Sequence, residues 1–462
     1  MVKITYRYCH LHLQVISFIR SFIYSFLVKK SKVAQKIGLC LLFFSVAGGI
    51  IGCNPRKSSQ TDRLEFWTMQ LKPTFTEYFT NLNNTFEQQN EAINIRWIDV
   101  SWSAMENKIL TSISAKTAPD VVNLNPKFAS QLATRNAWLD LESMVAPGVK
   151  ATYLPKIWQA SQIEVCQEDK CSQQTFGLPW YLTTTITIYN QDMLDKAKMS
   201  QVPQTYQELA RAARTIKQQT GKYAFFISFV PNDSADVLES FVKMGVNLVD
   251  ESGKAAFNNP RGRAVFQYWV DLYQQKLLPP DVLTQGHRRG VELYQAGEIA
   301  LLSSGAEFID SITNNAPTVA QSSAVAAQIT GASGKKGVAV MNLVIPRDSD
   351  KPEEALKYAL YVTNAKNQLA FAQKSNVLPS TKEAVAEYIE NTEQQSDSLK
   401  AQAKEVSASQ LEDAEVLIPT TKNINVLQKA IYENLQAAML DEKTVEQAVS
   451  DAAREWDSFK DK

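Results

Sequence analysis

Three short apolar segments decide the fold class: LEFWT (residues 64–68), INIRWIDV (93–100) and DVVNL (120–124). The first two alternate apolar and polar side chains, and the third is a short apolar run, so each is predicted to be a strand. Apolar residues recur at helical spacing between residues 74 and 89, and a second helix is predicted over 105–114. Strands that alternate with helices in this way form parallel crossover units, so we expect an α/β layer.

The rest of the chain continues the mixture of strands and helices. Further strands are predicted over 183–189 and 338–345, and helices over 205–220, 235–244, 261–275 and 352–390. No repeat with a period of 20–50 residues is present.

The net charge of zero hides two unlike parts. Residues 1–52 hold seven basic side chains and no acidic one, so the rest of the chain holds 48 − 7 = 41 basic and 48 acidic side chains. A body with a charge of −7 argues against nucleic acid as the main partner.

A short apolar run, residues 37–51, follows the basic flank of the first 52 residues. Fifteen residues are too few to cross a bilayer comfortably, so the run is interpreted as a secretory signal, with an uncleaved anchor helix as the alternative. The stretch before it is long, which leaves Val28 and Val33 as alternative translation starts. The run ends in IIGC (50–53), which resembles the bacterial lipobox. This resemblance implies cleavage after residue 52, lipidation of Cys53 and a tether over 53–62.

Two further cysteines, Cys166 and Cys171, flank a polar turn between two strand-like segments. In an exported protein we expect them to form a disulfide, with two free thiols as the alternative. No other Cys or His lies near enough in sequence to suggest a zinc site.

The body lacks a recognisable catalytic set. Its only histidine, His287, lies in GHRRG (286–290) and is interpreted as a surface loop residue. No Gly-x-Ser-x-Gly elbow, phosphate-binding loop or metal-spaced cluster is present, and no pair stands out among the 48 acidic residues. These features indicate a binding protein without cofactor or metal.

Several segments together resemble the extracellular solute-binding proteins of bacterial ABC importers, in particular the maltose-binding-protein-like group that serves oligosaccharides and polyols. They are LEFWTM (64–69), KILTSISAKTAPDVVNLN (108–125), GLPWY (177–181), YN (189–190), PQTYQEL (203–209), YQAGEIALLSSG (294–305), MNLVIPR (341–347) and PEEA (352–355). The chain departs from the family pattern at Lys336-Gly337, where a Gly-Gly pair is common, and at Glu307, where a tryptophan is common.

The resemblance implies two interleaved α/β lobes, joined by hinge segments around a central ligand cleft. With crossings near Thr183, Ser304 and Ile345, one lobe is expected over 63–182 plus 305–345 and the other over 183–304 plus 346–462. Solute binding would then stabilise a closed form by hinge motion.

Aromatic rings and buried amides or carboxylates are the groups that bind sugars. The candidates within the resembling segments and nearby are Trp67, Thr68, Trp102, Asn123, Asn125, Trp180, Tyr181, Phe229, Gly305, Glu307, Phe308, Met341 and Asn342. Core packing or helix capping is the alternative for each. Trp180 is the favoured single ligand contact, and Asn125 is favoured over Asn123.

The sequence therefore predicts a monomeric, lipid-anchored receptor in the cell envelope, on the periplasmic side in a Gram-negative cell. It would deliver a carbohydrate or polyol to permease subunits with a separate ATPase. An exported glycoside hydrolase, and a solute sensor or envelope scaffold on the same fold, are the alternatives.

Overall fold

A parallel strand–helix unit forms at the predicted place. The computed structural model describes residues 63–167, 170–231, 233–331, 333–393, 398–418 and 423–460. Strand β1 (Arg63–Met69) pairs in parallel with β2 (Asn94–Val100) on one side and with β3 (Val121–Leu124) on the other. Helices α2 (Thr76–Gln89) and α3 (Trp102–Ser114) connect them. The expected α/β class is confirmed.

Antiparallel strands extend this first sheet beyond β3. The long strand β10 (Lys336–Val344) pairs with β3 and with β6 (Leu178–Thr184), and the register shifts between Met341 and Asn342. Two short strands, β11 (Leu378–Pro379) and β12 (Ala414–Glu415), pair with β6 and β10. The strand order is β11-β6-β10-β3-β1-β2, with β12 beside β10.

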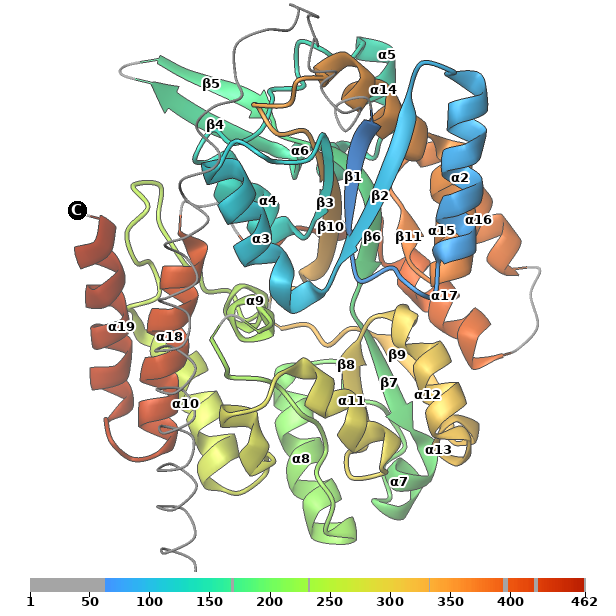
Figure 1. Cartoon of the computed structure of the whole chain (residues 1–462). Coiled ribbons are helices and arrows are strands. Elements are labelled where there is room, and N and C mark those ends of the chain that lie inside the picture. The colour runs from blue at the N-terminus through green and yellow to red at the C-terminus, as the bar shows by residue number, and fades with distance from the viewer. Residues whose placement is uncertain are drawn as a thin grey trace, which may run out of the picture. The chain divides into compact units, whose positions relative to one another are not determined.

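Helices cover both faces of the first sheet (Figure 1). Helices α2, α14 (Pro352–Val362) and α15 (Ala365–Ser375) contact one another and β6 on one side, and α4 (Pro126–Ala133) contacts β10 on the other. An aromatic cluster fills the first side; its members are Phe66, Phe79, Trp180, Tyr358 and Phe371. Each such buried ring contributes on the order of 2 kcal/mol of transfer free energy.

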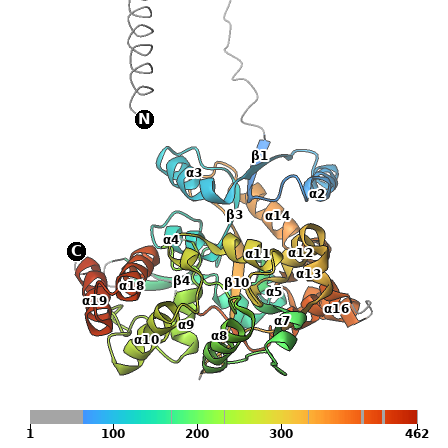
Figure 2. The same ribbon diagram turned by 90° about the horizontal axis from the view of Figure 1, so that it is seen from below.

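A second sheet and a second core follow β6. Strands β7 (Ile186–Asn190), β8 (Leu301–Ser304) and β9 (Ser323–Ala327) are antiparallel in the order β8-β7-β9. The helices around them are α7 (Gln191–Lys196), α8 (Tyr206–Thr220), α9 (Asp236–Lys243), α10 (Pro260–Gln274), α11 (His287–Gln295), α12 (Ile309–Asn315), α13 (Pro317–Gln321), α18 (Ile424–Met439) and α19 (Val445–Lys460). Both views place α18 and α19 side by side next to α10 (Figure 2).

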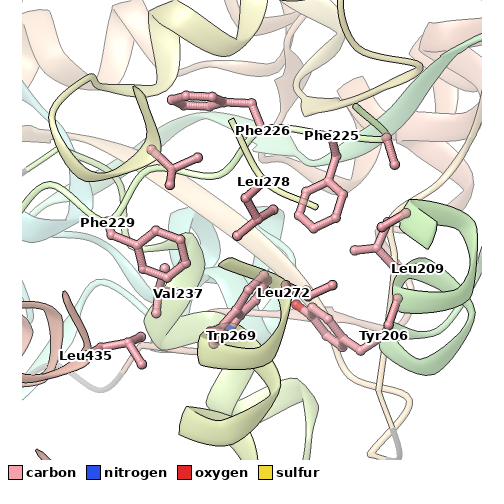
Figure 3. Close-up of a cluster of buried hydrophobic side chains, with 14 of the residues drawn as sticks. Tyr206, Leu209, Phe225, Phe226, Phe229, Val237, Trp269, Leu272, Leu278 and Leu435 are labelled. Carbon is pink, nitrogen blue, oxygen red and sulfur yellow. The ribbon is translucent and has the colours of Figure 1, made fainter. Parts of the chain in front are cut away.

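Trp269 lies at the centre of the second core (Figure 3). Its ring packs edge-on against Tyr206 and Phe229, and its Nε1 donates to Ser240 Oγ at 3.0 Å. A buried indole needs such a partner for its N–H, so the polar Ser240 side chain within this core has a specific role.

Local sequence signals explain where the helices of this core begin. Helix α8 starts with a capping box, in which Thr205 and Glu208 each satisfy a backbone N–H of the other, and it ends at Gly221 with φ of 71°. Such caps satisfy the free N–H groups of the first turn, and glycine adopts the left-handed conformation at the end without strain.

The two hydrophobic cores divide the chain differently from the expected lobes. The segment 306–312 packs in the second core and the segment 355–384 packs in the first, each opposite to its predicted lobe. The chain leaves the first sheet at Thr185, close to the predicted crossing near Thr183, but returns between β9 and β10 rather than near Ser304. It passes to the second core again between β12 and α18, not near Ile345.

Helix α17 (Leu399–Ser409) contacts both β6 of the first sheet and β7 and β9 of the second. The remaining elements are α5 (Pro147–Thr152), α6 (Pro155–Gln159), α16 (Lys382–Glu393), the 3-10 turns η1 (Pro280–Leu283) and η2 (Ala306–Phe308), and the hairpin of β4 (Gln162–Gln167) and β5 (Lys170–Thr175). In that hairpin the backbones of Cys166 and Cys171 are paired, but their side chains lie outside the described part of the chain, and so does Cys53. Within the described residues, no helix has the length and apolar character needed to cross a membrane.

Candidate functional site

The carboxyl ends of the three parallel strands meet at one edge of the first sheet, where open α/β sheets bind their ligands. Strand β2 lies on one side of β1 within the sheet, and β3 lies on the other side. The connection from β1 to β2 and the connection from β2 to β3 therefore run in opposite directions across the sheet. Trp102 begins α3 at this edge and is 47% exposed, the position expected of a ligand-stacking ring. Its backbone N–H donates to Gln70 Oε1 at 3.4 Å, which joins the ends of β1 and β2.

Asp99 fixes the turn that follows β1. It accepts hydrogen bonds from Thr68 Oγ1 at 2.7 Å and from the backbone N–H groups of Leu71 and Lys72 at 2.9 and 3.0 Å. Thr68 is fully buried and also accepts from Trp97 Nε1 at 2.8 Å. In this arrangement Thr68 shapes the strand end, and its hydroxyl is fully engaged.

Trp67 points to the opposite side of β1 from Phe66 and is only 5% exposed. Its Nε1 donates to Glu65 Oε2 at 3.2 Å, and Lys108 Nζ lies 4.1 Å from the centre of a ring of the indole. A cation over the ring face occupies the surface that a sugar would use.

Three of the predicted amides have structural partners. Asn125 caps α4 by accepting from Phe128 N at 2.8 Å. Asn342 accepts from Ser161 Oγ at 2.6 Å and donates to Val340 O at 3.0 Å. Asn123 Nδ2 approaches Asn342 O at 3.5 Å, and its buried Oδ1 has no partner among the described residues.

Two neighbouring aromatic residues on β6 lie in one aromatic cluster, because the register shift with β10 makes Trp180 the extra residue of a bulge. Trp180, the favoured ligand contact, is 1% exposed and stacks on Phe371 with ring centres 5.0 Å apart, so its ring belongs to the first core. Tyr181 is also buried in this core, where its ring meets the Trp180 ring edge-on with centres 5.0 Å apart and lies 5.4 Å from the Phe371 ring. Burial raises the pKa of Tyr181, and the negative charges of Glu307 and Asp99 raise it further.

The two carboxyl groups that raise this pKa come from different sheets. Tyr181 and Asp99 belong to the first sheet, whereas Glu307 follows β8 of the second sheet, in η2. Tyr181 therefore lies within electrostatic range of both carboxyl groups. We define the candidate site as the edge of the first sheet at Trp102 together with Tyr181, Asp99 and Glu307.

Glu307 carries a buried carboxyl group. Its Oε2 is inaccessible and has no hydrogen-bond partner among the described residues. Burial raises the pKa of Glu307 to about 7, and a hydrogen bond from its own backbone N–H offsets this only in part. Gly305 leaves the room for it, because a Cβ at that position would overlap with the Glu307 carboxyl oxygens.

His287 is the residue that sequence reasoning missed. It begins α11 and is half-buried rather than being a loop residue on the surface. Its Nε2 lies 3.0 Å from Ser304 Oγ, and its ring meets Phe308 edge-on with centres 5.7 Å apart. The sequence offered one signal, the glycine before it: a Cβ on Gly286 would overlap with Asp233, which accepts from His287 N at 2.7 Å.

Two predicted contacts lie in the cores. Phe229 is fully buried against Trp269 (Figure 3), and Met341 is buried in the first core. Of the predicted residues, Trp102, Tyr181, Gly305, Glu307 and Phe308 are the ones that the structure places at the candidate site.

Cavities and metal-ligand clusters do not add to this site. A polar hollow of about 340 Å³ opens beside α2 and β2, and a smaller one of about 50 Å³ lies beside Glu239 and Lys243; no predicted site residue lines either. Across the described ranges, no group of three or more His, Cys, Asp or Glu side chains is arranged to hold a metal ion.

The described architecture matches proteins of one family. The chain belongs to the bacterial extracellular solute-binding proteins, whose family model matches residues 70–369. A crystal structure of a putative oligosaccharide periplasmic-binding protein from Synechococcus sp. MITs9220 is 41% identical, with a TM-score of 0.80, over 86% of this chain and 98% of that one. The expected family and the two-lobed fold are confirmed.

More distant relatives agree with this assignment. A putative binding protein of Brucella abortus is 22% identical over 309 residues, which cover 66% of this chain and 73% of that protein. A maltodextrin-binding protein of Bacillus subtilis is 20% identical over 365 residues, which cover 75% and 81% of the two chains.

Proposed function

We propose that this protein is the sugar receptor of an ABC importer, and that it captures an oligosaccharide or related polyol and delivers it to a membrane permease. The observation that carries the proposal is the 41% identity, over 86% of this chain and 98% of the other, to a putative oligosaccharide periplasmic-binding protein. A relative from Deinococcus radiodurans that bears the name probable ABC transporter-binding protein supports the link to transport.

The chemistry of the candidate site suits a neutral sugar. Trp102 offers an exposed flat apolar ring at the ends of the strands, and Tyr181 and Glu307 offer a hydroxyl and a carboxyl group. Sugars present apolar C–H faces and a rim of hydroxyls, which these two kinds of group complement. No residue of the site needs to act as a nucleophile, so the proposal assigns binding without turnover.

Calorimetry against maltotriose, cellotriose, glucosylglycerol and a glycerol phosphodiester tests the proposal. Trp102→Ala should weaken the binding of the preferred sugar about tenfold or more, because an aromatic contact contributes roughly 1 kcal/mol beyond its buried area. Phe459→Ala is the matched control, since Phe459 is an aromatic of comparable exposure on α19. A folded sample that binds no carbohydrate would refute the proposal, and release of free sugar from the bound compound would favour the hydrolase.

We further propose export and lipid anchoring through Cys53, with the permease and ATPase as separate chains. The support is the basic flank and the IIGC segment at residues 50–53. Metabolic labelling with palmitate in a bacterial host should label the wild-type protein and leave Cys53→Ala unlabelled. Equal labelling of both proteins would refute Cys53 as the attachment point.

A further inference from the structure

Glu307 is the member of the candidate site that carries an unpaired buried carboxyl oxygen. Its inaccessible Oε2 has no hydrogen-bond partner among the described residues. A buried carboxylate without a donor is strongly unfavourable, and each unsatisfied buried group calls for a specific explanation. A donor that comes from outside the polypeptide would provide one.

The position of the carboxyl group is built by its neighbours. Gly305 provides the space in which the Glu307 side chain turns back, because a Cβ on Gly305 would overlap with both carboxyl oxygens. The adjacent Phe308 packs against the His287 ring, which itself lies beside Ser304. The segment from 304 to 308 therefore holds the carboxyl group in one place, within electrostatic range of Tyr181.

Among the described residues, no cation counters the charge of ionised Glu307. Tyr181 of β6 and Asp99 of β2 interact electrostatically at the same place, and both bear negative charge when ionised. The cations of α17 are engaged elsewhere, since Lys400 lies 3.0 Å from Asp310 and Lys404 donates to Gln373 O at 3.3 Å. The titratable and charged groups on the surrounding elements are thus Tyr181, Asp99, His287, Asp310, Lys400 and Lys404.

We propose that Glu307 Oε2 accepts a hydrogen bond from a hydroxyl group of the captured sugar, and that capture thereby releases a proton from this carboxyl group. The proposal rests on the proposed function. It identifies Glu307 as the group that selects ligands with a hydroxyl donor. On capture the carboxyl O–H bond breaks, the proton passes to the solvent, and the sugar hydroxyl donates to the resulting carboxylate. A donor that meets the ionised form stabilises that form.

Proton release makes the affinity depend on pH. The pKa of Glu307 is raised to about 7 in the protein described here, so the group is largely protonated at pH 6 and largely ionised at pH 8. If the sugar binds the ionised form alone, the affinity should be about tenfold higher at pH 8 than at pH 6, and about half a proton should leave per sugar at pH 7. These values apply to whichever sugar of the panel binds.

Titration calorimetry of the full chain in phosphate and in Tris at pH 7 measures the released proton, because the two buffers differ in ionisation enthalpy. Dissociation constants at pH 6 and pH 8 give the second readout. Glu307→Gln should lose both the proton release and the pH dependence, and Gly305→Ala should reduce both by displacing the carboxyl group while it keeps the charge. Glu298→Gln is the control, since Glu298 forms an exposed ion pair with Lys222 in the same lobe.

The outcomes distinguish a failure of this inference from a failure of the proposed function. A sugar that binds with equal heat in both buffers and equal affinity at both pH values overturns the role of Glu307 and leaves the sugar receptor intact. A proton release that survives Glu307→Gln assigns the proton to another group and overturns it as well. Failure of every sugar to bind refutes the proposed function and this inference with it.

Discussion

Replacement of Glu307 by glutamine should stabilise the unliganded protein at high pH and not at low pH. The pKa of Glu307 is raised from 4.5 to about 7 by burial. The folded state therefore holds a proton that the unfolded state loses, and the free energy of unfolding falls as the pH rises from about 4.5 to about 7. A shift of this size destabilises the folded protein by about 3 kcal/mol. This destabilisation is complete above pH 7 and absent below about pH 4.5.

Urea unfolding of wild type and Glu307→Gln at pH 4.5 and pH 8 measures this difference. The amide contributes any cost of its own equally at both pH values, so the change between them isolates the ionisation of the carboxyl group. Glu298→Gln, which removes an exposed ion pair, should change the stability by about 1 kcal/mol or less at either pH. Equal effects of Glu307→Gln at pH 4.5 and pH 8 would refute the buried carboxyl group as the cause.

Three further substitutions test the fold and the site. Trp269→Ala should lower the free energy of unfolding by about 3–5 kcal/mol in urea, since the ring fills the centre of the second core; a loss below about 1 kcal/mol would contradict that position. Thr68→Val should cost about 1–3 kcal/mol by the same assay, because Trp97 Nε1 and Asp99 Oδ1 lose a buried partner, and no loss would show that the network is unimportant. Trp180→Phe should change the sugar affinity by less than twofold in calorimetry, because Trp180 is buried in the first core. A tenfold loss of affinity would show that Trp180 contacts the sugar.

The local part of the fold could be predicted because its signals are local. The strands and helices from residue 64 to residue 124 were predicted from their own periodicity, and they form the parallel unit of the first sheet. The lobe boundaries could not be predicted in the same way. An amphipathic helix such as α14 shows which of its faces is buried, but not which of two sheets covers that face. The segment 355–384 was therefore assigned to the wrong core.

The candidate site illustrates how a bulge changes the direction of a side chain. Trp180 and Tyr181 are adjacent on β6, and strand alternation alone would send their side chains to opposite faces. The pairing of β6 with β10 shifts at this point, because Met341 pairs with Tyr181 and Asn342 with Pro179, which leaves Trp180 as the extra residue. Both rings lie in the aromatic cluster with Phe371. Such a bulge depends on pairing with a distant strand and could not be predicted from the sequence of β6.

Apart from the glycine before it, no feature of the sequence identifies His287, because its role depends on contacts that span the chain. It lies against Ser304 and Phe308, which follow it by 17 and 21 residues, and its own backbone is held by Asp233, 54 residues before it. No spacing motif connects such positions. The same limit applies to Glu307, whose unusual pKa follows from burial that only the assembled protein creates.

The interleaving of the two cores determines when each lobe can fold during synthesis on the ribosome. The first core needs residues from Leu64 to Ala414, and the second needs residues from Ile186 to Trp456. A nascent chain that ends at residue 350 lacks part of both cores, so neither lobe can complete its folding early in translation. Contacts between such distant segments also slow the search for the native state. Most of the polypeptide should therefore leave the ribosome before either lobe is complete, which favours a secretory route that threads unfolded chains.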